Sequence, residues 1–172
     1  MKQLVKQSGW DLLVRFTHWG VAALFFSNYL FTEEGSDIHQ WVGYTLLGLI
    51  VIRLLWGCVV QSPARLTRFL PSFPAAITHL KELRKTKQDN HDGHNPAGAL
   101  MVWFLWGSLL LICLSGWAMG TDLLWGEDWV KEVHEFAVNM TFIAVIYHVI
   151  AVIVMSKITG KRYLRGMIKG RH

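Results

Sequence analysis

Histidines inside apolar sequence are the residues of this chain with the most specific chemistry. His134 and His148 lie fourteen residues apart in one apolar stretch. On an α-helix this spacing is about four turns, which places the two imidazoles on nearly one face at levels about 21 Å apart. A single histidine there is explained equally well by a hydrogen bond to a neighbouring helix. Two levels on one helix indicate two separate ligand sites, because ionisable residues in membrane spans are usually functional and imidazole binds metals well.

Four apolar stretches supply the elements that must position these imidazoles. Crossing a bilayer as a helix takes about twenty residues, and lipid leaves unpaired backbone groups without partners, which favours helices over strands. The predicted spans are about 12–31, 38–60, 97–119 and 133–156. Arg15 and His18 interrupt the first stretch, which favours a retained helix over a signal peptide. The sequence therefore predicts an all-α membrane protein, a four-transmembrane-helix bundle forming one domain over 1–172.

Composition and charge fix the expected topology. The chain is 52% hydrophobic, with a mean hydropathy of +0.31. The first and third connections carry seven carboxylates against one base, Lys131, whereas most Lys and Arg lie near the termini and in the loop 61–96. These carboxylates are Glu33, Glu34, Asp37, Asp122, Glu127, Asp128 and Glu132. The positive-inside rule then predicts cytoplasmic N- and C-termini and a cytoplasmic loop 61–96. Topology and headgroup contact explain the net charge of +5, so no nucleic-acid partner is expected.

Depth in the predicted bundle decides which histidines can face one another. His18, early in the first span, and His148, late in the fourth, share the cytoplasmic level. His39 opens the second span at the periplasmic level, where His134 also lies. Two pairs at two depths suit two stacked haems, each held by two axial imidazoles in a bundle core. Either pair alone supplies too few ligands for a tetrahedral zinc or copper site.

The cysteines narrow the type of haem. Only Cys58 and Cys113 occur, both inside apolar stretches, and no C-x-x-C-H motif is present. Covalent c-type attachment is therefore excluded. Any haem must be held by coordination and packing.

Three further residues share the faces or depths of these histidines. Gly43 lies one turn after His39 and would let a porphyrin approach, or it serves close helix packing. Arg53, fourteen residues after His39, could pair with a propionate of the inner haem, or its side chain snorkels to the headgroups. Arg15, three residues before His18, has the same two interpretations.

Four motifs together resemble a known family. They are WDLLVRFTHW at the start, a histidine opening the second span, GHNPAGALMV before the third, and EVHEFAVNMTFIAVIYH in the fourth. Over essentially the whole chain this pattern resembles the bacterial cytochrome b561 proteins and the related b-type subunits of nickel–iron hydrogenases, and its compact length is more similar to the former. The resemblance implies a dihaem b cytochrome of the bacterial inner membrane, linked to ubiquinone or menaquinone. It carries the metal-ligand role onto His18, His39, His134 and His148.

The remaining histidines receive weaker predictions. His94 belongs to the GHNP segment and could contact a propionate or a quinone, although a role at the start of the third span is the alternative. His79, His91 and His172 are expected to be exposed and without a role. An amphipathic helix ending near Lys87 is expected in the loop 61–96.

The predicted function is electron transfer between the membrane quinone pool and a redox partner, expected to be a periplasmic cytochrome or another redox protein. A superoxide:quinone oxidoreductase and a membrane-anchor subunit of a hydrogenase or dehydrogenase are the alternatives, so enzymatic activity stays open and no catalytic residue is assigned. Seven outer carboxylates would repel superoxide and attract a basic carrier protein. A transporter is disfavoured, because the spans show neither inverted halves nor proline-broken helices.

Overall fold

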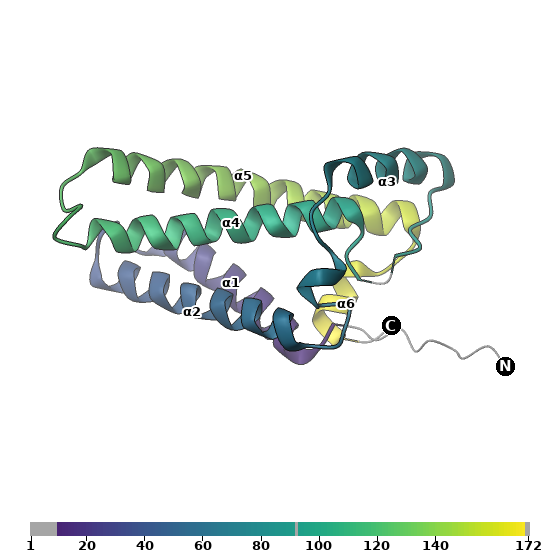
Figure 1. The fold of residues 1–172 in the computed structure, drawn as a ribbon, viewed down its shortest axis with the longest axis horizontal. Helices are drawn as coiled ribbons and strands as arrows, with labels where there is room; N and C mark the ends of the chain where they lie inside the picture. Colours follow the sequence, from purple (N-terminus) through teal and green to yellow (C-terminus); the bar gives the residue numbers. More distant parts are fainter. Residues whose placement is uncertain (1–9, 92, 171–172) are drawn as a thin grey trace.

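The computed structural model describes residues 10–91 and 93–170, and over these ranges every regular element is a helix. The elements are α1 (Leu12–Phe31), α2 (Asp37–Val59), the 3₁₀ turn η1 (Leu66–Arg68), α3 (Phe73–Thr86), α4 (Pro96–Met119), α5 (Asp128–Thr159) and α6 (Tyr163–Lys169). The four long helices run side by side, and α3, η1 and α6 gather at one end (Figure 1). We call this the basic end. The α1–α2 and α4–α5 connections form the opposite, acidic end (Figure 1).

The long helices identify the chain as a multi-pass membrane protein. Helices α2, α4 and α5 are each long and apolar enough to cross a membrane. Helix α1 has 20 residues but carries Arg15, His18 and Asn28, which make it less apolar. The all-α membrane architecture is thus confirmed, and α1 as the fourth span stays a prediction.

Helix α5 is longer than the span predicted at 133–156. It begins at Asp128 and ends at Thr159, a length of 32 residues. Asp128 in the first turn favours a helix start there, because its charge complements the helix dipole. At the other end, Gly160 adopts the left-handed conformation (φ 71°) that closes many helices. The helix therefore continues beyond the apolar stretch at both ends.

Side-chain caps fix where the helices begin. Asp11 accepts a hydrogen bond from the Val14 N–H at 2.9 Å at the start of α1. Ser36 accepts one from the His39 N–H at 3.2 Å, which holds His39 in the first turn of α2. Asn95 accepts one from the N–H of Gly98 at 2.8 Å and starts α4. Such caps satisfy N–H groups that a helix leaves unpaired at its first turn.

The middle of the bundle is filled by apolar side chains. Buried Phe25, Leu46, Ile50, Leu109 and Cys113 join α1, α2 and α4 in one cluster. Across the bundle, the rings of Tyr29 on α1 and Phe142 on α5 stack with their centroids 4.7 Å apart. Cys58 and Cys113 are both free thiols.

The basic end is tied together by the buried carboxylate of Asp89. Its oxygens accept hydrogen bonds from Asn95 Nδ2 at 2.8 Å, from the Tyr163 hydroxyl at 2.7 Å and from His91. Burial works to raise the pKa of Asp89, but these hydrogen bonds outweigh it and hold the pKa well below its usual range. Asp89 therefore links the start of α4 to α6 as a charged group. Helix α3 lies where the sequence predicts an amphipathic helix, with Lys87 as its C-cap.

Asp11 offers a direct test of this packing, because it both caps α1 and accepts the indole N–H of Trp56 on α2 at 3.2 Å. Asp11→Ala removes both bonds and should lower the free energy of unfolding by about 1–2 kcal/mol. Thermal unfolding followed by tryptophan fluorescence in detergent measures the loss. Asp11→Ser keeps a capping oxygen and should recover part of it. Glu127→Ala is the matched control, since Glu127 precedes α5 without a capping bond to its side chain among the described residues. An equal loss in both alanine variants would contradict the assignment.

Candidate functional site

The structure brings the four span histidines together as two pairs. His18 on α1 lies beside His148 on α5, with ring centroids 6.3 Å apart and ring planes at 52°. His39 on α2 lies beside His134 on α5, also at 6.3 Å, with planes at 61°. Because α5 carries one member of each pair, the pairs occupy two levels about 21 Å apart. The pair His39/His134 is the outer pair, near the acidic end, and His18/His148 is the inner pair.

The separation within each pair fits a shared metal centre. Two imidazoles that ligate one ion from opposite sides, with metal–nitrogen bonds of about 2 Å, have ring centres about 6 Å apart. Both pairs show 6.3 Å. Among the described residues, the two imidazoles of a pair form no hydrogen bond with each other. A direct hydrogen bond therefore does not explain why the two rings lie close together. The donor set therefore suits the two axial positions of a haem.

Hydroxyl groups set the orientation of the outer imidazoles. Thr32 Oγ1 lies 3.2 Å from His39 Nδ1. The Thr32 hydroxyl donates its proton to Asn28, whose backbone carbonyl oxygen and Oδ1 both lie 2.8 Å from Oγ1. Ser115 Oγ lies 3.0 Å from His134 Nδ1 and donates to the Leu111 carbonyl at 2.7 Å. Each hydroxyl proton is thus already used. Each Nδ1 must then be the donor, which leaves the Nε2 lone pair free to ligate.

Two glycines border the outer pair. A Cβ added at Gly116 would lie 3.2 Å from Cε1 of His134, so the glycine gives the imidazole its place against α4. A Cβ added at Gly43 would meet no described atom within 4 Å. The open side of Gly43 suits a bulky group, while its carbonyl accepts from Cys113 Sγ on α4 at 3.8 Å.

Arg53 marks the inner level. Its side chain is only 5% exposed, so it does not snorkel to the surface. Nη2 donates to the Ala64 carbonyl at 3.2 Å, and the guanidinium lies 5.1 Å from the ring centre of Trp106. Nη1 is buried and has no partner among the described residues. A buried cation with an unused donor calls for an anionic group.

His94 and Arg15 add further unused nitrogens. His94 packs between Trp10 and Phe69, with ring centroids at 4.6 and 4.4 Å. Burial, then the positive charge of Arg53, and then His148 and His18 in their protonated forms lower the pKa of His94 to about 3, so its ring is neutral at pH 7. Nδ1 of His94 and Nε of Arg15 are buried without partners among the described residues.

The inner pair lacks the hydroxyl support of the outer pair. Nδ1 of His18 is also buried without a described partner. The start of α4 is capped by Asn95, so His94 is not needed for that role. The inner level thus combines an imidazole pair with unused nitrogens that could bind carboxylates or a carbonyl oxygen.

The acidic end lies directly beyond the outer pair. Every one of the seven carboxylates in the predicted outer connections is exposed. The one base among them, Lys131, lies 3.5 Å from Glu135, one turn further along α5. The negative charge of this end is therefore presented to solvent almost without compensation.

Several residues of these sites could not be predicted from the sequence. They are Thr32, Ser115 and Gly116, which only the folded chain brings next to the histidines. The prediction that His79 is exposed is wrong, since this residue of α3 is only 5% exposed. His91 is exposed as predicted, and His172 lies outside the described residues.

Comparison with known proteins identifies the family of this chain. No curated protein and no solved structure gave a significant match. A sequence model of the family described as prokaryotic cytochrome b561 matches residues 9–170, a range that contains both histidine pairs and the whole described bundle. The chain therefore belongs to the prokaryotic cytochrome b561 family.

Proposed function

We propose that the chain is a dihaem b-type cytochrome that passes electrons between the membrane quinone pool and a redox partner at the acidic end. Family membership gives the coarser part of this statement, a b-type cytochrome of electron transfer. The observation that carries the finer part is the pair of equal 6.3 Å separations, His18 to His148 and His39 to His134.

The histidines would supply both axial positions of each haem. Haem iron held by two imidazoles takes up and releases one electron at a time. The protein's part is to hold the rings, and at the outer level Thr32 and Ser115 fix the Nδ1–H tautomer that leaves Nε2 free. A haem held by two histidines in this way would supply one-electron transfer rather than chemistry on a substrate bound at the metal.

Arg53, Arg15 and His94 would bind the polar groups of the inner level. Arg53 and Arg15 are cations with buried, unused nitrogens and suit haem propionates. His94 is neutral and suits a quinone oxygen, to which a ring N–H can donate. Ubiquinone or menaquinone would then bind near the basic end.

The separation of basic and acidic residues between the two ends of the bundle indicates its orientation in the membrane. The basic end would face the cytoplasm and the acidic end the periplasm, as the positive-inside rule requires for a bacterial inner-membrane protein. With α1 as the fourth span, both termini lie on the cytoplasmic side. The exposed carboxylates would attract a basic periplasmic cytochrome or similar carrier. They disfavour the superoxide oxidase alternative, because superoxide is an anion. The anchor-subunit alternative would instead require a hydrogenase or dehydrogenase that co-purifies with the chain.

Haem counting in histidine variants tests the pairing. The wild type should release two haems per chain into acid acetone, because no thioether bond holds them. His39→Ala and His134→Ala should remove one spectral component, and His18→Ala and His148→Ala the other. His79→Ala, a buried histidine outside both pairs, should keep two haems. Joint loss of the haem components assigned to His18 and His134, or a single haem in the wild type, would overturn the proposal.

Ser115→Ala tests the orienting hydroxyl. Without its acceptor, the Nδ1–H of His134 is left unpaired, and outer-haem affinity should fall about 10–100-fold. Haem transfer to a scavenging apoprotein, followed by absorption, measures this for each component. Thr45→Val is the matched control, because Thr45 Oγ1 bonds only the Trp41 carbonyl of its own helix. Equal weakening of both haems would show a general packing defect instead.

Neutralising Glu33, Glu34, Glu127 and Asp128 together tests the docking face. Reaction with a basic cytochrome should slow, and its salt dependence should flatten, since exposed charges act over about 8–10 Å at physiological ionic strength. Stopped-flow haem oxidation or reduction at several salt concentrations measures both effects. Quinol-driven reduction should persist. Faster reaction with superoxide in the same variant would support the alternative, and an unchanged salt slope with the cytochrome would exclude electrostatic docking here.

A further inference from the structure

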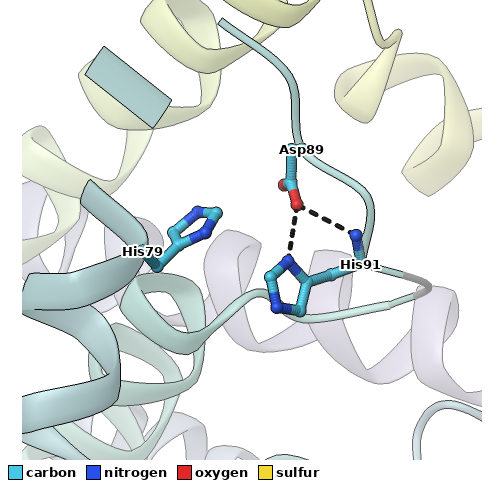
Figure 2. Close-up of side chains that lie close together, drawn as sticks. All are labelled: His79, Asp89 and His91. Atoms are coloured by element: carbon cyan, nitrogen blue, oxygen red, sulfur yellow. Dashed lines mark hydrogen bonds and ion pairs between the residues drawn. The ribbon is translucent and has the colours of Figure 1, made fainter. Parts of the chain in front are cut away.

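Three side chains at the basic end converge away from the histidine pairs. His79 comes from α3, and Asp89 and His91 come from the connection that follows it (Figure 2). One donor atom from each lies within 4.8 Å of the other two. Lys87 makes this possible, because its left-handed backbone (φ 54°) turns the chain back at the end of α3. The rings of His79 and His91 lie 4.9 Å apart at 89°.

His79 gives the clearest indication of a missing ligand. Its side chain is 5% exposed, and its Nε2 is buried without a partner among the described residues. Figure 2 shows the ring directed toward Asp89 and His91. A buried ring nitrogen without a hydrogen bond is unfavourable, so the position calls for a group that can accept its lone pair or take its proton.

Asp89 supplies negative charge at the same point. Its Oδ1 accepts from Nδ1 of His91 at 2.8 Å and from the His91 backbone N–H at 3.1 Å. No lysine or arginine in the described part of the chain forms an ion pair with it. A cation that entered the cluster would replace the side-chain bond to His91 and balance the buried carboxylate.

The donor set selects the class of ion. Two imidazoles and one carboxylate suit zinc and similar divalent transition metals, whereas magnesium and calcium prefer oxygen ligands alone. The cluster borders a hollow of about 350 Å³ that is lined by His79 and His91 and also by Glu82, one turn further along α3. His91 is 43% exposed at its side chain, which gives an ion a route from solvent.

We propose that His79, Asp89 and His91 bind one divalent transition-metal ion of the zinc class, with water in the fourth position. The ion would fasten α3 to the connection that leads into α4. Through the 2.7 Å bond between Asp89 and Tyr163, it would also fasten α6. The site would therefore brace the basic end over the inner histidine pair. It does not depend on the haem assignment.

Zinc titration of the full-length, untagged protein in detergent tests the site. After chelator treatment, calorimetry should show one equivalent of bound Zn²⁺ in the wild type. His79→Ala and His91→Ala should each weaken binding at least tenfold. Glu135→Gln, a substitution at an exposed carboxylate of α5 outside the cluster, should bind as the wild type does. Glu82→Gln should also bind normally if water fills the fourth position.

A second readout separates metal binding from folding. Zn²⁺ should slow tryptic cleavage after Lys87 in the wild type and leave the rate unchanged in His91→Ala, whose exposed side chain makes it the mildest of the cluster variants. Tryptophan fluorescence in the absence of zinc should be the same in both proteins and reports that each is folded. Absence of stoichiometric zinc binding in the wild type, or equal binding in the double variant His79→Ala/His91→Ala, would overturn the site. These results are readable whether the chain holds two haems, one or none.

Discussion

An imidazole inside a membrane bundle must find a partner for each of its two ring nitrogens, because lipid offers none. The rest of this structure follows from that requirement. At the outer level, Thr32 and Ser115 bond one nitrogen of each ring and leave the other nitrogen free. An ion held between the rings, as proposed above, would satisfy both remaining lone pairs. Spacing along α5 repeats the arrangement four turns away, so one helix organises both levels.

The two levels are built differently around the same pair of rings. The outer pair has neutral hydroxyl neighbours and lies beneath an exposed carboxylate surface. The inner pair lies among Arg53, Arg15 and the neutral ring of His94, with several buried nitrogens still unused. Negative charge beyond one level and positive charge beside the other make their electrostatic environments opposite. Since nearby charge and burial tune the reduction potential of a haem, haems bound at the two levels would differ in reduction potential.

Helix spans and pairing by depth could be predicted from the sequence, because the period of a helix relates residue spacing directly to height and face. The early start of α5 could not be predicted from the apolar stretch. The first residues of α5 are too polar for an apolar span, although they suit a helix N-terminus. The hydroxyl groups that bond the outer histidines could not be predicted from the sequence either. Thr32 reaches His39 across a turn, and Ser115 reaches His134 from another helix. The burial of His79 could not be predicted, because it depends on the turn of the chain at Lys87. Lys87 adopts a left-handed conformation, and its residue type does not indicate such a turn.

The apolar middle of the bundle has a consequence for a membrane that carries a voltage. Thr141 lies midway between His134 and His148 and is fully buried, with its hydroxyl bonded to its own helix at the Ala137 carbonyl. Phe25 and Ile50 are nearly as inaccessible at the centre of the bundle. Each unit charge that leaks through 100 mV dissipates about 2.3 kcal/mol. These three side chains leave no free hydrogen-bond donor, so they offer water and protons no chain to follow, whereas an electron needs none. If electrons pass between the two levels as proposed, the bundle centre would act as an insulator that separates electron flow from ion flow.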